Sequence, residues 1–396
     1  MMARRAFVVV LDAVGAGALP DTVDYGDPVD SDTLVHVAEA VGGLRLPVLG
    51  ALGLGNVRTV AGVVPSADPA LHGRLAPQGP GKESTTGHWE LMGVVTPAPL
   101  PAYPDGFPAD LLSRLDAVAG GCGFCCNAPY SGTDVIRDFG EHHLASGELI
   151  LYTSADSVLQ LAAHHAVLPE EELRALCGRI RREVMVGPDA VGRVIARPFA
   201  GAPGAFERTE GRKDFAVRPP GRSYLEELSE RGVPVHAVGK THDLFAGVGF
   251  TDRHAGASNA RGLEQTGRLV DELDHGLVFT NLIETDQRYG HRKDTEGFAD
   301  ALGLIDAAVG RWLPRLGPDD LLVLTADHGL DPLAPHTDHT REHVPLLARF
   351  AGAGGRRHDG AFADVGASVL AWLTDQDAPE LPGRSFLRAG APPLPG

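Results

Sequence analysis

Residues 6–12 read AFVVVLD, so that six apolar residues are followed at once by Asp12. An unbroken apolar run of this length is typical of a central strand in a parallel sheet, because both faces of such a strand are buried. The same pattern recurs later, each time with polar residues close behind, at residues 233–238, 277–283 and 321–326. The sequence therefore predicts a sheet that is mostly parallel.

Helical periodicity fills the stretches between these predicted strands. Its clearest instance is a set of apolar residues spaced four, three, four and three apart: Phe298, Leu302, Ile305, Val309 and Trp312. Such spacing turns one side of a helix toward the core. Ser223 followed by Glu226 indicates a capping box before residue 233. Strands alternating with helices predict an α/β fold, with helices flanking the sheet.

The length of 396 residues suggests two domains. Proline-dense segments flank residues 97–220 and indicate hinges around an insertion: Pro97, Pro99, Pro101, Pro104 and Pro108 on one side, Pro219 and Pro220 on the other. We expect a catalytic core formed by residues 1–96 and 221–396, and a smaller α+β cap formed by residues 97–220.

The net charge of the chain limits the kinds of partner that it can bind. Lysine and arginine number 35 against 52 aspartates and glutamates, a net charge of −17, which argues against nucleic acid or an anionic membrane as the main partner. Four cysteines make no disulfide framework, and no pattern of a signal peptide precedes the first strand. We expect a cytoplasmic protein. The lack of a long apolar heptad pattern favours a monomer.

Polar residues follow the predicted strands, where ligands of open parallel sheets gather. Asp12, Asp286, Asp327 and His328 occupy such positions, and further histidines follow nearby. Carboxylates and imidazoles without thiolates suit Mn²⁺, Mg²⁺ or Zn²⁺. Two such ions about 3.5 to 4 Å apart can bind both the attacking and the leaving oxygen in a phosphoryl transfer. A single aspartate after a strand is more often a cap, but several together predict a metal site.

A candidate nucleophile lies in residues 81–90, which read GKESTTGHWE. A hydroxyl at such a glycine-flanked turn meets free backbone N–H groups, and a metal ion lowers its pKa. An ordinary helix cap has the same appearance. Ser84, Thr85 and Thr86 all remain candidates at this point.

With these residues in view, the chain resembles the phosphopentomutases of the alkaline phosphatase superfamily. The resemblance covers nearly the whole chain and consists of motifs in the same order: residues 10–12, 81–90, 152–160, 191–199, 239–240, 286–292, 325–329 and 337–342. It implies a metalloenzyme core with an inserted cap. The implied activity interconverts ribose 1-phosphate, or the 2-deoxy sugar, with the 5-phosphate through a phosphorylated hydroxyl.

The resemblance also implies roles for single residues. One metal ion would be held by Asp286, His291 and His339, and the other by Asp12, Asp327 and His328. The family carries a threonine nucleophile four residues before the histidine at position 88, which places the role on Ser84 here. The residues implied to bind the sugar phosphate are Ser154, Asp156, Arg193, Arg208 and Lys240. The implied cofactors are two divalent ions, most often Mn²⁺, with glucose 1,6-bisphosphate or a similar sugar bisphosphate as activator.

Two other classes of function fit the same core. One is a related metal-dependent enzyme, either a cofactor-independent phosphoglycerate mutase or a phosphatase. The other is a protein without catalysis that binds metal or a sugar phosphate. The motifs at residues 154–160 and 193–199 favour the pentose enzyme, because they lie in the predicted cap, where such families diverge. Small-molecule sugar phosphates are the expected partners.

Overall fold

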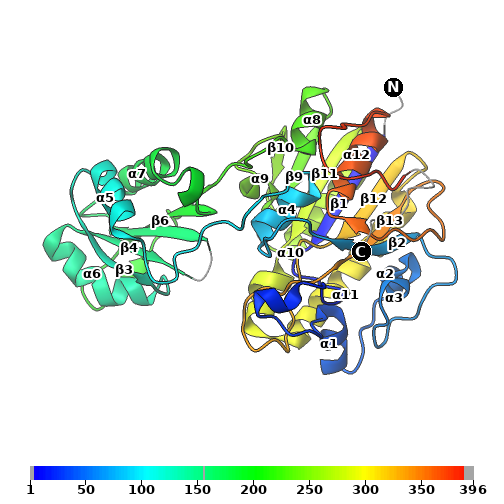
Figure 1. Ribbon diagram of the computed structural model, residues 1–396, viewed down its shortest axis with the longest axis horizontal. Coiled ribbons are helices and arrows are strands. Elements are labelled where there is room, and N and C mark those ends of the chain that lie inside the picture. The colour runs from blue at the N-terminus through cyan, green and yellow to red at the C-terminus, as the bar shows by residue number, and fades with distance from the viewer. Residues whose placement is uncertain (1–3, 155–156, 388–396) are drawn as a thin grey trace. The chain divides into compact units, whose positions relative to one another are not determined.

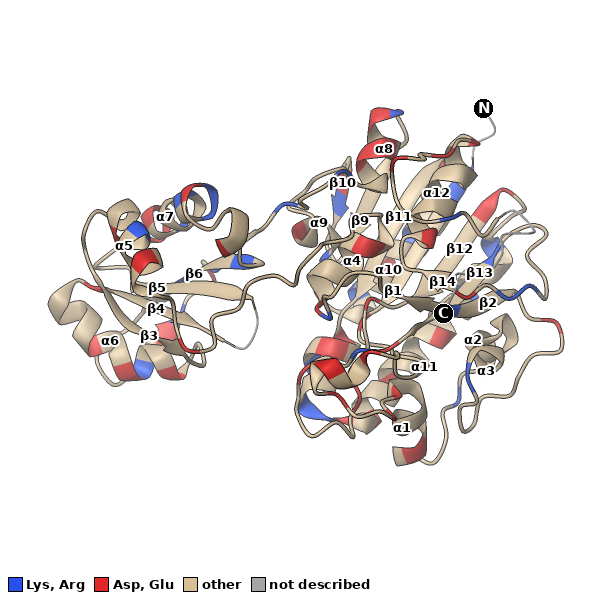
Figure 2. Ribbon diagram, in the orientation of Figure 1, with Lys and Arg blue, Asp and Glu red and all other residues tan. Residues whose placement is uncertain are grey.

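The computed structural model describes residues 4–154 and 157–387. Two compact units make up the chain, one from Met1–Pro99 with Pro219–Gly396 and the other from Leu100–Arg218. The insertion expected from the prolines comprised residues 97–220. Figure 1 shows the elements of each unit. Acidic and basic residues are spread over the elements of both (Figure 2).

The first unit is built on an eight-stranded sheet within the described residues. In spatial order its strands are β10 (Asp252–His254), β9 (Val235–Val238), β11 (Gly276–Leu282), β1 (Arg5–Leu11), β12 (Asp320–Thr325), β13 (Val344–Arg349), β2 (Leu71–Ala76) and β14 (Gly360–Ala361). All pairs are parallel except those of β13 with β12 and with β2. The mostly parallel sheet predicted from the apolar runs is confirmed, because the four runs overlap β1, β9, β11 and β12, which pair in parallel.

The central position of β1 explains its apolar sequence. It pairs with β11 on one side and β12 on the other, and residues 6–10 are at most 1% exposed. The register sets Val10 beside Asn281 and Thr325. All three strands run in the same direction, so their carboxyl ends meet at one edge of the sheet. The polar residues that follow the strands are thereby brought together.

Helices flank this sheet (Figure 1). The predicted 298–312 helix is α11 (Thr295–Trp312), and its five periodic apolar residues are all buried. The capping box of Ser223 and Glu226 is confirmed at the start of α8 (Tyr224–Glu230). The other helices of this unit are α1 (Thr33–Ala40), α2 (Pro47–Leu52), α3 (Leu54–Val57), α4 (Ser84–Leu91), α9 (Thr241–Leu244), α10 (Asn259–Glu272) and α12 (Asp364–Thr374).

The second unit has a mixed sheet with the strand order β3-β4-β5-β6-β7, and β8 also pairs with β6. Its elements are β3 (Phe124–Pro129), β4 (Leu149–Thr153), β5 (Val158–His164), β6 (Arg193–Ala200), β7 (Glu207–Arg208), β8 (Lys213–Ala216), α5 (Ala109–Ala119), α6 (Asp134–Ser146) and α7 (Glu170–Glu183). Successive strand residues alternate between two cores. Leu161 and Val194 pack with α5 and α7, whereas Ile150 and Phe199 pack with α6.

Among residues 4–154 and 157–387, we find no helix that combines the length and the apolar character needed to span a membrane.

Candidate active site

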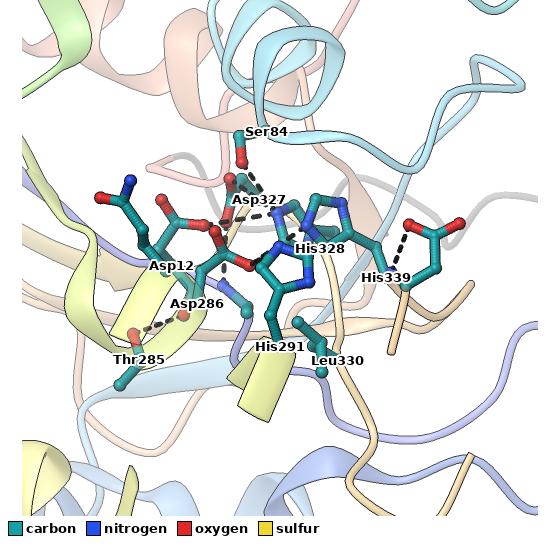
Figure 3. A network of polar contacts seen from close by, with 12 residues as sticks. Asp12, Ser84, Thr285, Asp286, His291, Asp327, His328, Leu330 and His339 are labelled. Carbon is teal, nitrogen blue, oxygen red and sulfur yellow. Dashed lines mark hydrogen bonds and ion pairs between the residues drawn. The ribbon is translucent and has the colours of Figure 1, made fainter. Parts of the chain in front are cut away.

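The carboxyl ends of β1, β11 and β12 carry the predicted metal ligands. Asp12 directly follows β1, Asp327 and His328 follow β12, and Asp286 lies in a short π-helical turn (Thr285–Tyr289) after β11. These side chains turn toward one another (Figure 3). Asp12 and Asp327 are separated by more than three hundred residues in sequence, so only the parallel pairing of their strands makes them neighbours.

Three predicted ligands form one group in which all donor atoms lie within 4.8 Å of one another: Asp286, His291 and His339. Asp286 Oδ1 is 3.1 Å from His339 Nε2 and 3.3 Å from His291 Nε2. The other ring nitrogen of each histidine faces a backbone carbonyl. His339 Nδ1 faces the carbonyl of Lys82, and His291 Nδ1 faces the carbonyl of Thr337. Such outer contacts hold each imidazole with Nε2 toward the carboxylate, as in protein metal sites.

Asp12, Asp286 and His328 form a second group of the same kind. Asp12 Oδ1 lies 3.3 Å from His328 Nε2, and Asp286 belongs to both groups, so the two groups adjoin. The resemblance assigned Asp327 to the same metal ion as Asp12 and His328. Asp327 is outside this second group but close to it. Its Oδ2 lies 3.3 Å from His328 Nε2. The imidazole rings of His328 and His339 stack with centroids 3.8 Å apart.

The carboxylate oxygens show that divalent cations fit here. Asp12 Oδ2 accepts a hydrogen bond from Asn281, and Asp327 Oδ1 accepts one from the backbone of Ala13. Asp12 Oδ1 and Asp327 Oδ2 are buried and have only imidazole nitrogens nearby, at 3.1 to 3.3 Å, without a well-formed hydrogen bond from the described residues. Buried anionic oxygens without a donor are costly unless a cation binds them. A set of oxygen and imidazole donors suits hard or borderline divalent ions.

The ionisable groups of this cluster shift one another's pKa values. Burial raises the pKa of Asp12 to about 6, and the neighbouring charge of Asp327 adds to this effect. Burial opposes a charged imidazole at His328, but Asp327 and Asp12 outweigh it and raise its pKa to about 10. Burial also disfavours a charged Asp286, yet His339 holds the pKa of that carboxyl below its usual value. The carboxylates thus create a strong preference for positive charge, which a bound metal ion supplies.

Ser84 is the first residue of α4 and points its hydroxyl toward this cluster (Figure 3). Ser84 Oγ lies 3.1 Å from His328 Nε2. The Thr86 hydroxyl instead donates to the carbonyl of Glu83 at 3.2 Å. The start of a helix also presents backbone N–H groups that favour an anion such as phosphate. Ser84 therefore combines the position and the surroundings that a phosphate-carrying hydroxyl requires.

Two further residues of the site had no role in our sequence analysis. His88 is fully buried, with Nδ1 at 3.1 Å from Asp327 Oδ2 and at 2.8 Å from the carbonyl of Ser84. Asn281 lies within β11 and connects His88 to Asp12 through its Nδ2 atom, at 3.1 and 2.7 Å. The available signals were the four-residue spacing from Ser84 to His88 and a polar amide inside an apolar run.

The predicted sugar-phosphate residues lie in both units. Lys240 is the N-cap residue of α9 in the first unit, with Nζ 3.4 Å from Gln287 Oε1. In the second unit, Ser154 follows β4, Arg193 begins β6 and Arg208 is exposed on β7. Asp156 lies outside the described residues. The substrate-binding role of all five residues stays a prediction.

Comparison with known proteins gives a consistent result. The family profile of the metalloenzyme superfamily matches residues 4–375. The phosphopentomutase of Anaeromyxobacter dehalogenans strain 2CP-1 is 50% identical over 375 residues, 94% of this chain and 96% of that one. The phosphopentomutase of Caldanaerobacter subterraneus subsp. tengcongensis is 44% identical and covers 98% of both chains. Among solved structures, the PH0037 protein from Pyrococcus horikoshii covers 96% of this chain and 99% of its own, with 13% identity and a TM-score of 0.49.

Proposed function

Because this chain belongs to the phosphopentomutases of the metalloenzyme superfamily, we propose that it interconverts the 1- and 5-phosphates of ribose or 2-deoxyribose through a phosphorylated Ser84. The family makes it a metal-dependent phosphotransferase of the isomerase type. The observation that carries the finer proposal is the contact of Ser84 Oγ with His328, at the junction of the two candidate ligand groups.

The reaction proceeds in two transfers that leave the enzyme unchanged. In the first, the bond between phosphorus and Ser84 Oγ breaks and a bond forms to the free hydroxyl oxygen of the sugar phosphate, whose proton passes to Ser84 Oγ. The resulting bisphosphate then presents its other phosphoryl group. In the second transfer, the bond between that phosphorus and the sugar oxygen breaks, Ser84 Oγ accepts the phosphoryl group and gives up its proton to the sugar oxygen, and the sugar leaves with its phosphate at the opposite end. A sugar bisphosphate such as glucose 1,6-bisphosphate can supply the first phosphoryl group.

We assign two divalent ions to the carboxylates and imidazoles at the strand ends. The residues proposed as ligands are Asp12, Asp286, His291, Asp327, His328 and His339. Ions bound by these residues would neutralise phosphate oxygens and lower the pKa of the serine hydroxyl. Mn²⁺ is the proposed physiological ion, because the family resemblance favours it and the donor set contains only carboxylate and imidazole groups. His88 contacts Asp327 and Asn281 binds Asp12, and these contacts orient the two carboxylates.

Substrate recognition is proposed for Ser154, Asp156, Arg193, Arg208 and Lys240. Arginine is suited to this role because its planar fork binds two phosphate oxygens at once. The acidic chain, with a net charge of −17, needs such local cations to attract a phosphorylated sugar. We also propose that the protein acts on these small molecules as a cytoplasmic monomer.

The deciding experiment supplies ribose 1-phosphate, Mn²⁺ and a trace of glucose 1,6-bisphosphate, and follows ribose 5-phosphate and free phosphate in the same tube. Formation of ribose 5-phosphate without stoichiometric free phosphate supports the mutase. Free phosphate as the main product would identify a phosphatase. Conversion of 3-phosphoglycerate in place of the pentose phosphate would identify the other mutase, and no turnover at all would favour a binding protein.

Intact-protein mass spectrometry tests the nucleophile. Ser84→Ala should take up no phosphoryl group from glucose 1,6-bisphosphate, whereas Thr85→Ala and Thr86→Ala should still be phosphorylated. A phosphorylated Ser84→Ala protein, together with an unmodified Thr85→Ala or Thr86→Ala protein, would move the role by one or two residues.

A further inference from the structure

Three side chains of the second unit form a further group of candidate metal ligands: Cys125, His142 and Glu148. Their ligand atoms, a thiol sulfur, an imidazole nitrogen and a carboxylate oxygen, all lie within 4.8 Å of one another. The group shares no residue with the candidate metal centre of the first unit, and it differs from that centre by containing a thiol. Our sequence analysis assigned no role to any of the three residues.

Each member of this group comes from a different part of the fold. Cys125 lies on β3, His142 lies near the end of α6, and Glu148 directly precedes β4. Helix α6 packs against β3 and β4 (Figure 1). Cys125 packs in the core on the α6 side of the sheet, whereas its neighbour Phe124 packs in the core on the other side. The pleat of β3 therefore turns the thiol toward the helix that carries the imidazole.

Hydrogen bonds in the turn between α6 and β4 place Glu148 beside the helix. Ser146 Oγ donates to the carbonyl of His142 at 2.9 Å and accepts from the backbone N–H of Glu148 at 3.1 Å. His143 Nδ1 binds the carbonyl of Glu148 at 2.6 Å. Glu148 Oε2 lies 2.5 Å from His142 Nε2. Two of the three candidate ligands are thus brought together by the chain itself.

The charges of this group favour a divalent cation. Among the described residues, the carboxylate of Glu148 forms an ion pair with His142 alone, so no lysine or arginine neutralises it. The Cys125 thiol makes a weak hydrogen bond to the carbonyl of Leu149, at 3.7 Å. A thiol that binds a metal ion gives up its proton to solvent. One thiolate and one carboxylate then balance the two positive charges of the ion.

The types of ligand indicate which ion is preferred. Thiolate is a soft ligand that favours Zn²⁺ over Mn²⁺ or Mg²⁺, and imidazole and carboxylate oxygen also bind Zn²⁺. Zinc with three protein ligands keeps the fourth tetrahedral position for water. The side chains of His142 and Glu148 are 55% and 38% exposed, so solvent reaches the group.

We propose that Cys125, His142 and Glu148 bind a zinc ion, with a water molecule as the fourth ligand. The ion would join α6 and the start of β4 to β3, the outermost strand of the second unit's sheet. This zinc site goes beyond the proposed function, because the phosphoryl transfers use none of its ligands. Zinc would be selected by the thiolate, which the metal centre of the first unit lacks.

Co²⁺ substitutes for Zn²⁺ and reveals the thiolate, because a cobalt–thiolate bond gives an intense charge-transfer absorption in the near ultraviolet. All four cysteines of the chain lie in the second unit, so this absorption cannot arise from the first. The full-length protein, stripped with EDTA and kept reduced by a phosphine, is titrated with Co²⁺ and then with Zn²⁺. We expect the absorption to saturate at one thiolate-bound Co²⁺ per chain and to disappear as Zn²⁺ displaces the cobalt.

Two matched pairs of variants identify the ligands. Cys125→Ser should abolish the absorption, whereas Cys126→Ser, which replaces the next residue of β3 outside the ligand group, should keep it. His142→Gln should raise the Kd for Zn²⁺ at least about a hundredfold, because the loss of an outer contact alone costs about ten- to a hundredfold. His165→Gln, which also replaces an exposed histidine of the second unit, should leave the Kd unchanged.

Three results would overturn the zinc site. They are the absence of the absorption in the wild-type protein, its persistence in Cys125→Ser, and an unchanged Kd in His142→Gln, which would show that a cysteine binds the ion adventitiously. Misfolding does not explain a loss of affinity in His142→Gln, because that side chain is more than half exposed. The titrations involve no turnover, so failure of the zinc site and failure of the proposed function are distinguishable.

Discussion

Asn281 is the one amide side chain of β11, and it contacts two parts of the candidate metal centre. Its Nδ2 atom donates to Asp12 Oδ2 at 2.7 Å and lies 3.1 Å from His88 Nε2. His88 in turn approaches Asp327 at 3.1 Å. The amide occupies one oxygen of Asp12 and leaves the other for a cation. Residues of this outer layer commonly set metal affinity as strongly as the ligands do.

Replacing this amide should therefore weaken metal binding while all ligands remain. We expect Asn281→Ala to raise the Kd for Mn²⁺ by about tenfold or more. Electron paramagnetic resonance of free Mn²⁺ during a titration gives the Kd directly. Asn56→Ala is the control, because the side chain of Asn56 binds only the backbone of Ser66 among the described residues. An unchanged Kd in Asn281→Ala would show that the Asp12 carboxylate needs no such support.

At the scale of elements, one arginine binds the segment before α4 at two of its carbonyl groups. Arg341 is 5% exposed, and its Nη1 donates to the carbonyls of Gly79 and Gly81 at 2.8 and 3.0 Å. Its Nη2 donates to Asp21 at 3.0 Å. The same segment ends at Ser84, so Arg341 fixes the approach of the serine to the metal centre. We regard it as a positioning residue.

Arg341→Met should lower kcat at least about tenfold, because small displacements of reacting groups are costly. It should also lower the free energy of unfolding by about 2 kcal/mol, since the carbonyl groups of Gly79 and Gly81 lose their donor. Steady-state kinetics and urea unfolding measure the two effects. Arg357→Met removes an exposed ion pair with Asp359 and should change neither by much. A normal kcat in Arg341→Met would mean that the segment keeps its place without the arginine.

A buried histidine ties α6 to the sheet of the second unit. His143 Nε2 accepts from the backbone of His164 at 2.9 Å, so its Nδ1 must donate to the carbonyl of Glu148 at 2.6 Å. Protonation would remove the acceptor. Burial accordingly lowers the pKa of His143 below its usual value.

The unfolded chain therefore binds this proton more readily than the folded one, and stability is lost as the pH falls below about 6.5. Urea unfolding between about pH 8 and pH 5 should show this decline. His143→Gln should reduce the slope, whereas His142→Gln, at a more exposed position, should not. An equal slope in the wild type and in His143→Gln would assign the proton to other groups.

At the scale of the whole molecule, the residues of the candidate metal centre all belong to the first unit. Asp12, Asp286 and His328 lie at the ends of three neighbouring strands of its sheet. Bound cations would link these strands and relieve the repulsion among the carboxylates. Stability of the first unit should therefore depend on metal ions, whereas the second unit has its own two cores.

Calorimetry tests this difference. Mn²⁺ at 100 times its Kd should stabilise the folded state by about 2.7 kcal/mol per site and raise Tm by several degrees. Only the transition of the first unit should move, and EDTA should reverse the shift. In Asp286→Asn, which alters the carboxylate shared by both groups, Mn²⁺ should have little effect. A shift of the same size in that variant would place the stabilising metal elsewhere.

Much of this architecture was predictable from local sequence. Apolar runs mark β1, β9, β11 and β12, because strands buried on both faces carry mostly apolar side chains. The periodicity of residues 298–312 marks α11 for the analogous reason. Polar residues placed at the ends of these runs predicted which side chains come together in the candidate ligand groups, since parallel strands end at a common edge. These features depend on burial patterns that each segment carries by itself.

Other features depended on contacts between distant segments. The sharing of Asp286 by both ligand groups of the first unit, the contact of His88 with Asp327 and the approach of Cys125 to His142 have no local signature. Each is set by strand register and side-chain rotamers, which the whole core determines together. The sequence by itself thus determined which residues form the strands, the main helix and the candidate ligands. Only the tertiary structure decided which of their atoms meet, because hydrogen bonds and metal geometry require ångström-scale placement that residue order does not encode.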